Sequence, residues 1–337
     1  MVNRLVWADA LRGLLILLVV LGHSLQHGDY ENRVAWNIIY SFHMAVFFTI
    51  SGYVSYKENP SWTILPKRAK QLLLPFVSWS LLGLIIGNRL NLNSITEIIL
   101  RPDNSYWFIY VLFVINLLFL IVNSLGKIIH NQNIALSICI LSLVLIMVVT
   151  EFRIFGFQFI SLYFGFYVLG YWLKKYSVQI TPPNWGKYLF HVVICVLGLV
   201  WFALAIFWKM HEVPTPLQSF DFLPASILTY SYRYLTALVG SIFFIGLAMI
   251  TMNNANNKII LWLVFLGKIS LGIYIIHLFI GRWFGTWFVN LFPSETSILF
   301  VASDFLIKLM ISILAVQVIE KIPYISLLFL GKQAKLK

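Results

Sequence analysis

Long stretches of this chain are almost entirely apolar, and short polar segments separate them. A run of about 17–25 apolar residues is long enough to cross a bilayer as a helix. The pattern therefore predicts an all-α, polytopic membrane protein. The ten expected transmembrane helices cover residues 12–27, 35–56, 71–88, 105–124, 134–150, 157–173, 188–208, 227–250, 269–290 and 298–319.

The composition agrees with this class. Of the 337 residues, 60% are hydrophobic and 11% are charged, and the mean hydropathy is +0.87. These values exclude an ordinary soluble domain. The first apolar stretch is not followed by a small-residue cleavage site, which predicts a retained helix rather than a signal peptide. With no internal repeat visible, we expect residues 1–337 to form a single integral membrane domain.

The placement of basic residues tests the number of helices, because Lys and Arg collect in cytoplasmic loops. If both termini are cytoplasmic, the inner segments hold 16 of the 24 basic residues but only 3 of the 12 acidic ones. An odd number of helices would mix these two groups. The sequence therefore predicts ten helices with both termini on the cytoplasmic side.

The net charge of +12 follows from this topology and from attraction to anionic lipid. The basic residues are scattered over loops and tails and are not interleaved with exposed aromatic residues, which argues against nucleic-acid binding. Cys139 and Cys195 lie in apolar stretches, where neither a disulfide framework nor a thiolate metal site is expected.

Arg12 and His23 are the most informative polar residues, because both fall within the first apolar segment. Eleven helical steps bring two side chains to within about 20° of the same face and about 16 Å apart along the axis. An ionisable residue inside a membrane helix costs several kcal/mol when it is left unpaired in hydrocarbon. Its presence there therefore indicates a functional site. The alternative for His23 is a core residue whose hydrogen bonds are satisfied.

A basic cluster of Lys67, Arg68 and Lys70 precedes Pro75, between the second and third expected helices. Its ordinary interpretation is a cytoplasmic loop that obeys the positive-inside rule. Together with Arg12, the cluster could instead hold phosphates at the membrane surface, arginine through paired hydrogen bonds and lysine as a point charge.

An acyl-CoA has phosphates at one end and a thioester at the other, and it would fit the distance between Arg12 and His23. A neutral imidazole at His23 could then take the proton from a hydroxyl group that attacks the thioester. His27, four residues further on, raises the alternative of a zinc pair. Asp29, Glu31 or His43 would have to supply a third ligand, but no spacing demands one, so we predict no metal site.

Further polar residues fall within the later expected helices. His43 lies in the outer half of the second helix, and Ser270, Tyr274 and His277 share one face of the ninth at spacings of four, three and seven.

Three charged residues lie in the outer halves of the last expected helices. Asp304 and Lys308 are four residues apart in the tenth helix, and Arg233 lies in the eighth. One interpretation is an ion-pair network that orients the helices. The other is a polar cavity for an acceptor substrate.

Taken together, these segments resemble the acyltransferase-3 family of integral membrane O-acyltransferases. The segment ADALRGLLILLVVLGH is similar to the family's opening motif, with Arg12 and His23 at its key positions. SFHMAVFFTISGYV, SYWFIYVLF at Trp107, LGKISLGIYIIH and IEKIPYISLLFLG, with Glu320 and Pro323, resemble the family's later segments in the same order. One departure is KRAKQLLLP, in which Gln71 stands where many members carry a basic residue.

The resemblance implies transfer of an acetyl or similar short acyl group from cytoplasmic acyl-CoA to a sugar hydroxyl of a surface polysaccharide or lipid-linked glycan. It implies a multi-pass protein of the bacterial plasma membrane with no permanently bound cofactor. The residues after 319 are too few for the esterase-like domain of some members, so we expect the minimal membrane form.

The resemblance also implies roles for the residues that match the family. Arg12, Lys67, Arg68 and Lys70 would hold the donor. His23 would act as general base or as a transient acyl acceptor. His43, Tyr274 and His277 would orient the acceptor or stabilise the oxyanion.

The main alternative is a secondary transporter or flippase for a glycan-related substrate, which also needs about ten helices with buried charges. The chain shows neither an inverted repeat nor matching Gly/Pro-broken helices in its two halves. A non-catalytic membrane scaffold would leave Arg12 and His23 unexplained.

Overall fold

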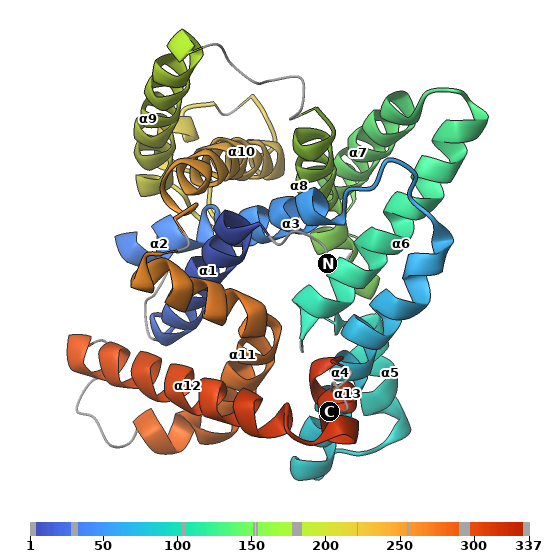
Figure 1. The fold of residues 1–337 in the computed structure, drawn as a ribbon, viewed down its shortest axis with the longest axis vertical. Helices are drawn as coiled ribbons and strands as arrows, with labels where there is room; N and C mark the ends of the chain where they lie inside the picture. The colour runs from blue at the N-terminus through green and yellow to red at the C-terminus, as the bar shows by residue number, and fades with distance from the viewer. Residues whose placement is uncertain are drawn as a thin grey trace. The chain divides into compact units, whose positions relative to one another are not determined.

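The computed structural model describes residues 5–27, 33–102, 106–150, 152, 154–176, 184–220, 222–254, 256–289 and 297–332. Within these ranges the regular structure is entirely helical (Figure 1). Ten of the helical segments are long and apolar enough to cross a membrane. The predicted all-α class and the predicted number of spanning helices are thus confirmed, whereas the cytoplasmic placement of the termini stays a prediction.

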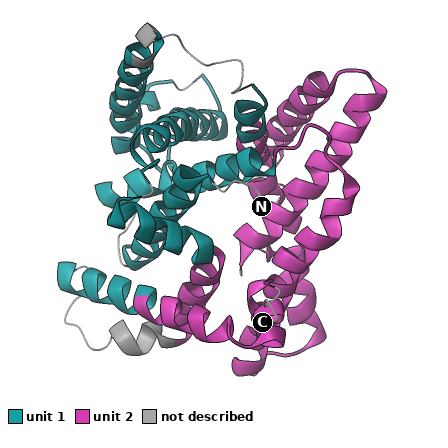
Figure 2. Ribbon diagram, in the orientation of Figure 1, with its two compact units in different colours: residues 1–55, 169–270, 284–309 teal, residues 56–168, 271–283, 310–337 magenta. Residues whose placement is uncertain are grey.

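The chain forms two compact units, coloured separately in Figure 2. Unit 1 comprises residues 1–55, 169–270 and 284–309, and unit 2 comprises residues 56–168, 271–283 and 310–337. Both units are assembled from segments distant in sequence. The expected single membrane domain stays a prediction beside this division.

Unit 1 contains α1 and the helices around it. Its complete helices are α1 (Val6–Ser24), α2 (Val34–Tyr40), α3 (His43–Ser55), α9 (Asn184–Ile206) and α10 (Ala225–Thr251). It also takes the end of α8 (Phe157–Tyr176), the start and end of α11 (Lys258–Val289) and the first part of α12 (Ile298–Ile319).

Helices α1 and α11 cross in backbone contact within unit 1. A Cβ atom on Gly13 would overlap the carbonyl oxygen of Leu263, and one on Gly267 would overlap that of Asp9. Small residues permit such close approach of membrane helices. The crossing therefore holds the part of α1 that carries Arg12 in place against α11.

Unit 2 is built around α4 and α6. Its helices are α4 (Leu65–Ile86), α5 (Leu92–Leu100), α6 (Trp107–Ile128), α7 (Gln132–Val149), α13 (Pro323–Leu330), and parts of α8, α11 and α12, with short 3-10 turns at Trp62–Ile64 and Ile154–Gly156. Helices α6 and α7 form a hairpin, and α13 packs on α4.

The contact between α13 and α4 has a well-defined polar component. The Trp79 indole Nε1 donates to the Phe329 carbonyl at 2.8 Å. Gly331 ends α13 with φ 63°, and a Cβ there would overlap the backbone of Gln71. The left-handed cap and the close approach both require glycine at this position.

The second expected span, 35–56, corresponds to residues Val34–Ser55, but a turn that was not predicted divides it into α2 and α3. Between α2 and α3 the Ser41 hydroxyl donates to the Ile38 carbonyl at 2.7 Å, and the His43 Nδ1–H donates to the Ile39 carbonyl at 2.6 Å. Polar side chains thus satisfy backbone acceptors at the end of α2. Hydropathy alone cannot register this break, because both halves are apolar.

Helix α1 begins at Val6, six residues before its expected start at 12. Two other helices also begin six or more residues before the prediction. Helix α4 begins at Leu65, six residues before the expected start, with Pro66 in its first turn, where a proline is tolerated. Helix α11 begins at Lys258 rather than 269. In both cases the sequence predicts a loop, because lysine or arginine side chains lie within this part of the helix. The shorter α5 and α13 were not predicted.

Candidate functional site

Helix α1 places Arg12 and His23 on one continuous helix, as predicted, because it runs without interruption from Val6 to Ser24. The Arg12 guanidinium Nη1 donates to Asp9 Oδ1, one turn earlier, at 3.4 Å. The two side chains are 25% and 13% exposed. Arg12 therefore has a carboxylate neighbour that the sequence did not single out, although the spacing i, i+3 would have revealed it.

His23 is half-buried in the last turn of α1. Its Nδ1 lies 3.0 Å from Gln26 Oε1, and the Tyr40 hydroxyl donates to the same oxygen at 3.3 Å. Neither Gln26 nor Tyr40 was predicted from the sequence as a site residue. The i, i+3 spacing to His23 was a signal for Gln26, whereas no sequence signal linked Tyr40 to His23.

Tyr40 has a histidine on each side. Its ring centroid lies 6.4 Å from that of His23 and 4.9 Å from that of His43, both edge to face. Trp36 stacks on Tyr40 with a centroid distance of 4.1 Å. His43 is buried, and it interacts electrostatically with His23. The structure thus brings together two of the predicted site histidines.

The predicted pair of Asp304 and Lys308 is a buried salt bridge on α12. Lys308 Nζ lies 2.6 Å from Asp304 Oδ2, and the two side chains are 7% and 6% exposed. Both residues interact electrostatically with His23. Phe300 and Val301, one turn before this pair, pack against Leu21 and Leu25, beside His23.

We call this group of residues the His23 cluster, and it lies entirely within unit 1. It combines a half-buried imidazole, a buried imidazole, a phenol, an amide and a buried ion pair. Such a group can move protons and hold a polar substrate in a membrane protein. Its members are His23, Gln26, Tyr40, His43, Asp304 and Lys308.

Arg233 lies among aromatic side chains and a backbone carbonyl. Its guanidinium donates to the Met210 carbonyl at 3.2 Å and lies over the rings of Trp208 and Tyr230, at 5.7 and 5.6 Å. Trp208 in turn packs against Trp36 and Tyr232. The described contacts of Arg233 therefore fix the segment that follows α9.

Ser270, Tyr274 and His277 lie on α11, as their spacing predicted. The Ser270 hydroxyl donates to the Gly267 carbonyl at 2.9 Å within unit 1. In unit 2, the Phe108 amide donates to the Tyr274 hydroxyl at 3.3 Å, and the His277 Nδ1–H donates to the Ile273 carbonyl at 2.9 Å. The rings of Tyr274 and His277 are 5.9 Å apart, so unit 2 has a polar pair of its own.

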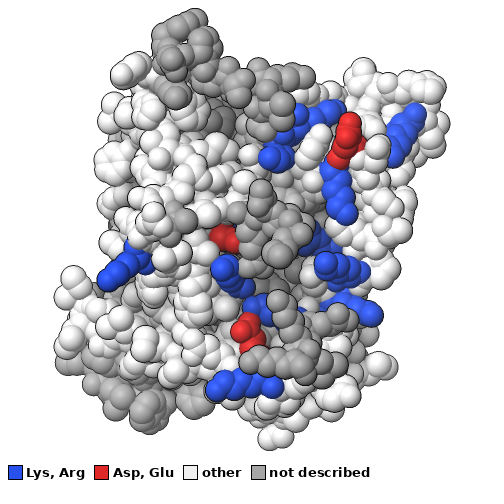
Figure 3. Space-filling view, viewed as in Figure 1, with Lys and Arg blue, Asp and Glu red and all other residues white. Residues whose placement is uncertain are grey.

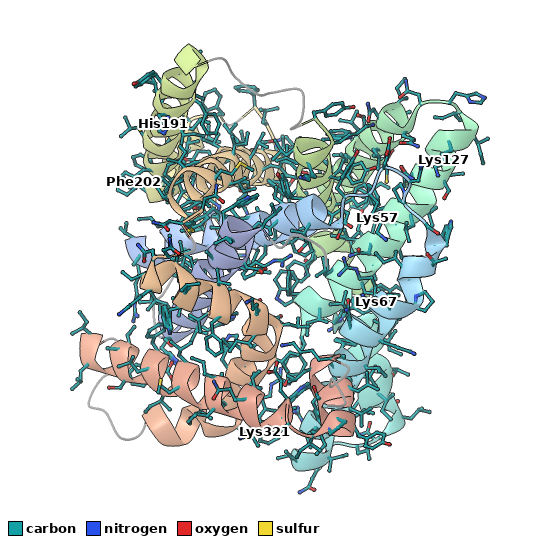
Figure 4. All side chains as sticks on the ribbon, viewed as in Figure 1. Lys57, Lys67, Lys127, His191, Phe202 and Lys321 are labelled. Atoms are coloured by element: carbon teal, nitrogen blue, oxygen red, sulfur yellow. The ribbon has the colours of Figure 1, made fainter. Side chains whose placement is uncertain are left out.

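Lys67, Arg68 and Lys70 lie in the first turns of α4, rather than in the loop that the sequence predicted. Lys67 and Lys70 are exposed, and Arg68 is half-buried. Figure 4 labels Lys67 at the start of this helix. The start of a helix also carries a partial positive charge. Together with the three basic side chains, it would attract a phosphate to this end of α4.

Lys and Arg outnumber Asp and Glu on the face seen in Figure 3. No group of three His, Cys, Asp or Glu side chains suited to a metal ion occurs in the described part of the chain. His27 packs edge to face on Phe300, with centroids 5.0 Å apart. Asp29 and Glu31 lie outside the described residues.

Comparison with known proteins gives one match over nearly the whole chain. A family model described as an acyltransferase domain, that of acyltransferase family 3, matches residues 5–316. This range includes all the members of the His23 cluster. No solved structure matches the chain.

Two curated relatives match shorter segments. The nodulation protein NolL of Mesorhizobium japonicum is 35% identical over 132 residues, which are 33% of this chain and 34% of that protein. The protein of the same name from Sinorhizobium fredii is 41% identical over 91 residues, which are 23% of this chain and 24% of that protein. The matches thus span about a third and a quarter of the lengths of these relatives.

Proposed function

Because this chain belongs to the acyltransferase-3 family and is a multi-pass membrane acyltransferase, we propose that it transfers an acetyl or similar short acyl group from acyl-CoA to a glycan hydroxyl. The acceptor is a sugar of a surface polysaccharide or a lipid-linked glycan, and the membrane is the bacterial plasma membrane. The observation that carries the proposal is the His23 cluster, in which a half-buried imidazole lies among polar and charged groups within an apolar helix bundle.

In the proposed reaction the acceptor hydroxyl gives its proton to His23 while its oxygen attacks the thioester carbonyl. The carbon–sulfur bond then breaks, the acyl group stays on the sugar oxygen as an ester, and the CoA thiolate takes up a proton. His23 ends the cycle neutral once it returns its proton. A buried site favours this chemistry because water does not compete for the acyl group.

Arg12 is a candidate contact for the phosphates of the donor, because an arginine can form paired, charge-assisted hydrogen bonds with them. The basic start of α4, with Lys67, Arg68 and Lys70, is a second candidate contact. Each contact is proposed on its own chemistry and is tested by its own substitution.

His43 lies in the His23 cluster and is proposed to orient the acceptor hydroxyl. Asp304 and Lys308 are proposed to set the charge around His23. Ser270, Tyr274, His277 and Arg233 are proposed as structural or acceptor-contacting polar residues, with the hydrogen bonds given above.

The test is transfer of radiolabel from [¹⁴C]acetyl-CoA into the glycan fraction of membranes that contain equal amounts of each variant. We expect label with the wild type and none with His23→Ala. His191→Ala is the matched control, because His191 is an exposed histidine on α9, and it should transfer label like the wild type. Equal transfer by His23→Ala and the wild type would remove His23 from the reaction.

The same membranes distinguish an acyltransferase from a transporter. A transporter would move a glycan-related substrate without consuming acetyl-CoA. Loss of the thioester and appearance of free CoA, measured beside label transfer, therefore give separate outcomes for the two classes.

A further inference from the structure

The three buried or half-buried histidines with a described Nδ1 hydrogen bond have two kinds of partner, backbone and side chain. His43 and His277 each donate from Nδ1 to the backbone carbonyl four residues earlier, Ile39 and Ile273. Their rings are thus fixed by their own helices. The Nδ1 of His23 instead meets a side chain, Gln26, three residues later.

The choice of partner determines which ring nitrogen can act as a base. A neutral imidazole carries one proton, and the nitrogen that does not carry it holds the lone pair. The amide oxygen of Gln26 lies 3.0 Å from His23 Nδ1 and also accepts from the Tyr40 hydroxyl at 3.3 Å. An oxygen that accepts from both groups keeps the proton on Nδ1 and leaves the lone pair on Nε2.

We propose that Gln26 is a positioning residue that holds the His23 ring in the tautomer with a basic Nε2, and that Tyr40 holds Gln26 in place. The proposal rests on the proposed function, in which His23 accepts the proton of the acceptor hydroxyl. In that step the proton moves from the hydroxyl to Nε2, and the proton on Nδ1 remains in its hydrogen bond to Gln26.

The other titratable groups near His23 in the described part of the chain have contacts of their own. Those that interact with it are Tyr40 of α2, His43 of α3, and Asp304 and Lys308 of α12. Tyr40 itself contacts the Gln26 oxygen, and Asp304 holds Lys308 at 2.6 Å. Gln26 is the hydrogen-bond partner that the structure describes for the Nδ1 atom.

Two substitutions separate acceptance by Gln26 from simple packing. Gln26→Leu keeps most of the side-chain volume but removes the acceptor. Gln26→Glu keeps an oxygen acceptor at the same place and adds a negative charge. The matched control is Gln317→Leu, because Gln317 is an exposed glutamine on α12.

The assay measures transfer of label from [¹⁴C]acetyl-CoA to the glycan of membrane vesicles over a range of pH, together with binding of acetyl-CoA. We expect Gln26→Leu to lower kcat by about 10- to 1,000-fold, part of the usual contribution of a general base, with acetyl-CoA binding within about twofold of the wild type. We expect Gln26→Glu to restore most of the rate. Because its carboxylate stabilises the imidazolium form, the acid limb of its pH–rate profile should move to higher pH.

Gln26→Leu with the wild-type kcat, or Gln26→Glu as inactive as Gln26→Leu, would overturn the proposal. If Gln26→Leu does not fold, Tyr40→Phe replaces it, and an unchanged kcat there would also count against the proposal. Failure of the proposed function gives a different result, since either the wild type would then transfer no label or His23→Ala would transfer as much label as an active wild type.

Discussion

The ammonium group of Lys308 lies 2.6 Å from the carboxylate of Asp304, one turn earlier on α12, and both side chains are buried beside the last turn of α1. Neither side chain is exposed enough for water to solvate its charge. The pair therefore neutralises itself locally, and it imposes a cost on any change that removes only one partner.

Replacing Lys308 with methionine should destabilise the protein, because it leaves a buried carboxylate without its cation. We expect a loss of about 3–5 kcal/mol in the free energy of unfolding, seen as a lower melting temperature in detergent. The double substitution Asp304→Asn with Lys308→Met should recover most of this loss. Lys258→Met is the control, because Lys258 is exposed at the start of α11. Equal melting of Lys308→Met and the wild type would show that the pair carries no stability.

Replacing Gly13 with alanine should reduce the yield of folded protein, because the added Cβ would overlap the Leu263 carbonyl at the crossing of α1 and α11. Gly83→Ala is a matched control within another membrane helix, since a Cβ there meets no atom within 4 Å. Gly83→Ala should fold like the wild type or gain up to about 1 kcal/mol from the higher helix propensity of alanine. Fluorescence-detected size-exclusion chromatography of both variants measures the difference, and equal yields would contradict the crossing.

The main features of the fold could be predicted from the sequence because the bilayer sets the length of each apolar stretch. All ten predicted spans have counterparts among the helices. The errors occur where a different physical rule acts. Lys258 and Lys268 made the start of α11 look like a loop, but lysine side chains can reach the interface from within a helix. The break before His43 depends on side chains that bind backbone carbonyls, which hydropathy does not measure.

The candidate site could be predicted in part. Arg12 and His23 stood out because polar residues are rare in apolar helices, and the pairing of Asp304 with Lys308 followed from their i, i+4 spacing. The contact of Tyr40 with His23 could not be predicted, because it depends on the way α2 packs against α1, whereas Tyr40 and His43 are only three residues apart. Periodicity within a helix finds partners on that helix and says little about partners on others.

The orientation of the chain in the membrane can be tested in unit 2 by cysteine labelling. The positive-inside rule predicts that residue 91, before α5, is outside and that residue 130, between α6 and α7, is inside. In a background with Cys139 and Cys195 replaced by alanine, Asn91→Cys should react with an impermeant maleimide in intact cells. His130→Cys should react only after the membrane is permeabilised. The opposite pattern would invert the topology.

Replacing Arg12 with alanine should weaken acetyl-CoA binding more than it slows turnover, because the proposed role of Arg12 is to bind phosphate. Loss of one charge-assisted contact, about 1.5–3 kcal/mol, corresponds to a roughly 10- to 150-fold higher dissociation constant, measured with labelled acetyl-CoA on purified protein. Arg12→Lys should recover part of the affinity, since lysine keeps the charge but not the paired hydrogen bonds. Asp9→Asn separates this effect from the local ion pair, because it removes the carboxylate 3.4 Å from the guanidinium and leaves Arg12 in place. If Arg12→Ala binds acetyl-CoA like the wild type, Arg12 serves the helix through Asp9 and not the donor.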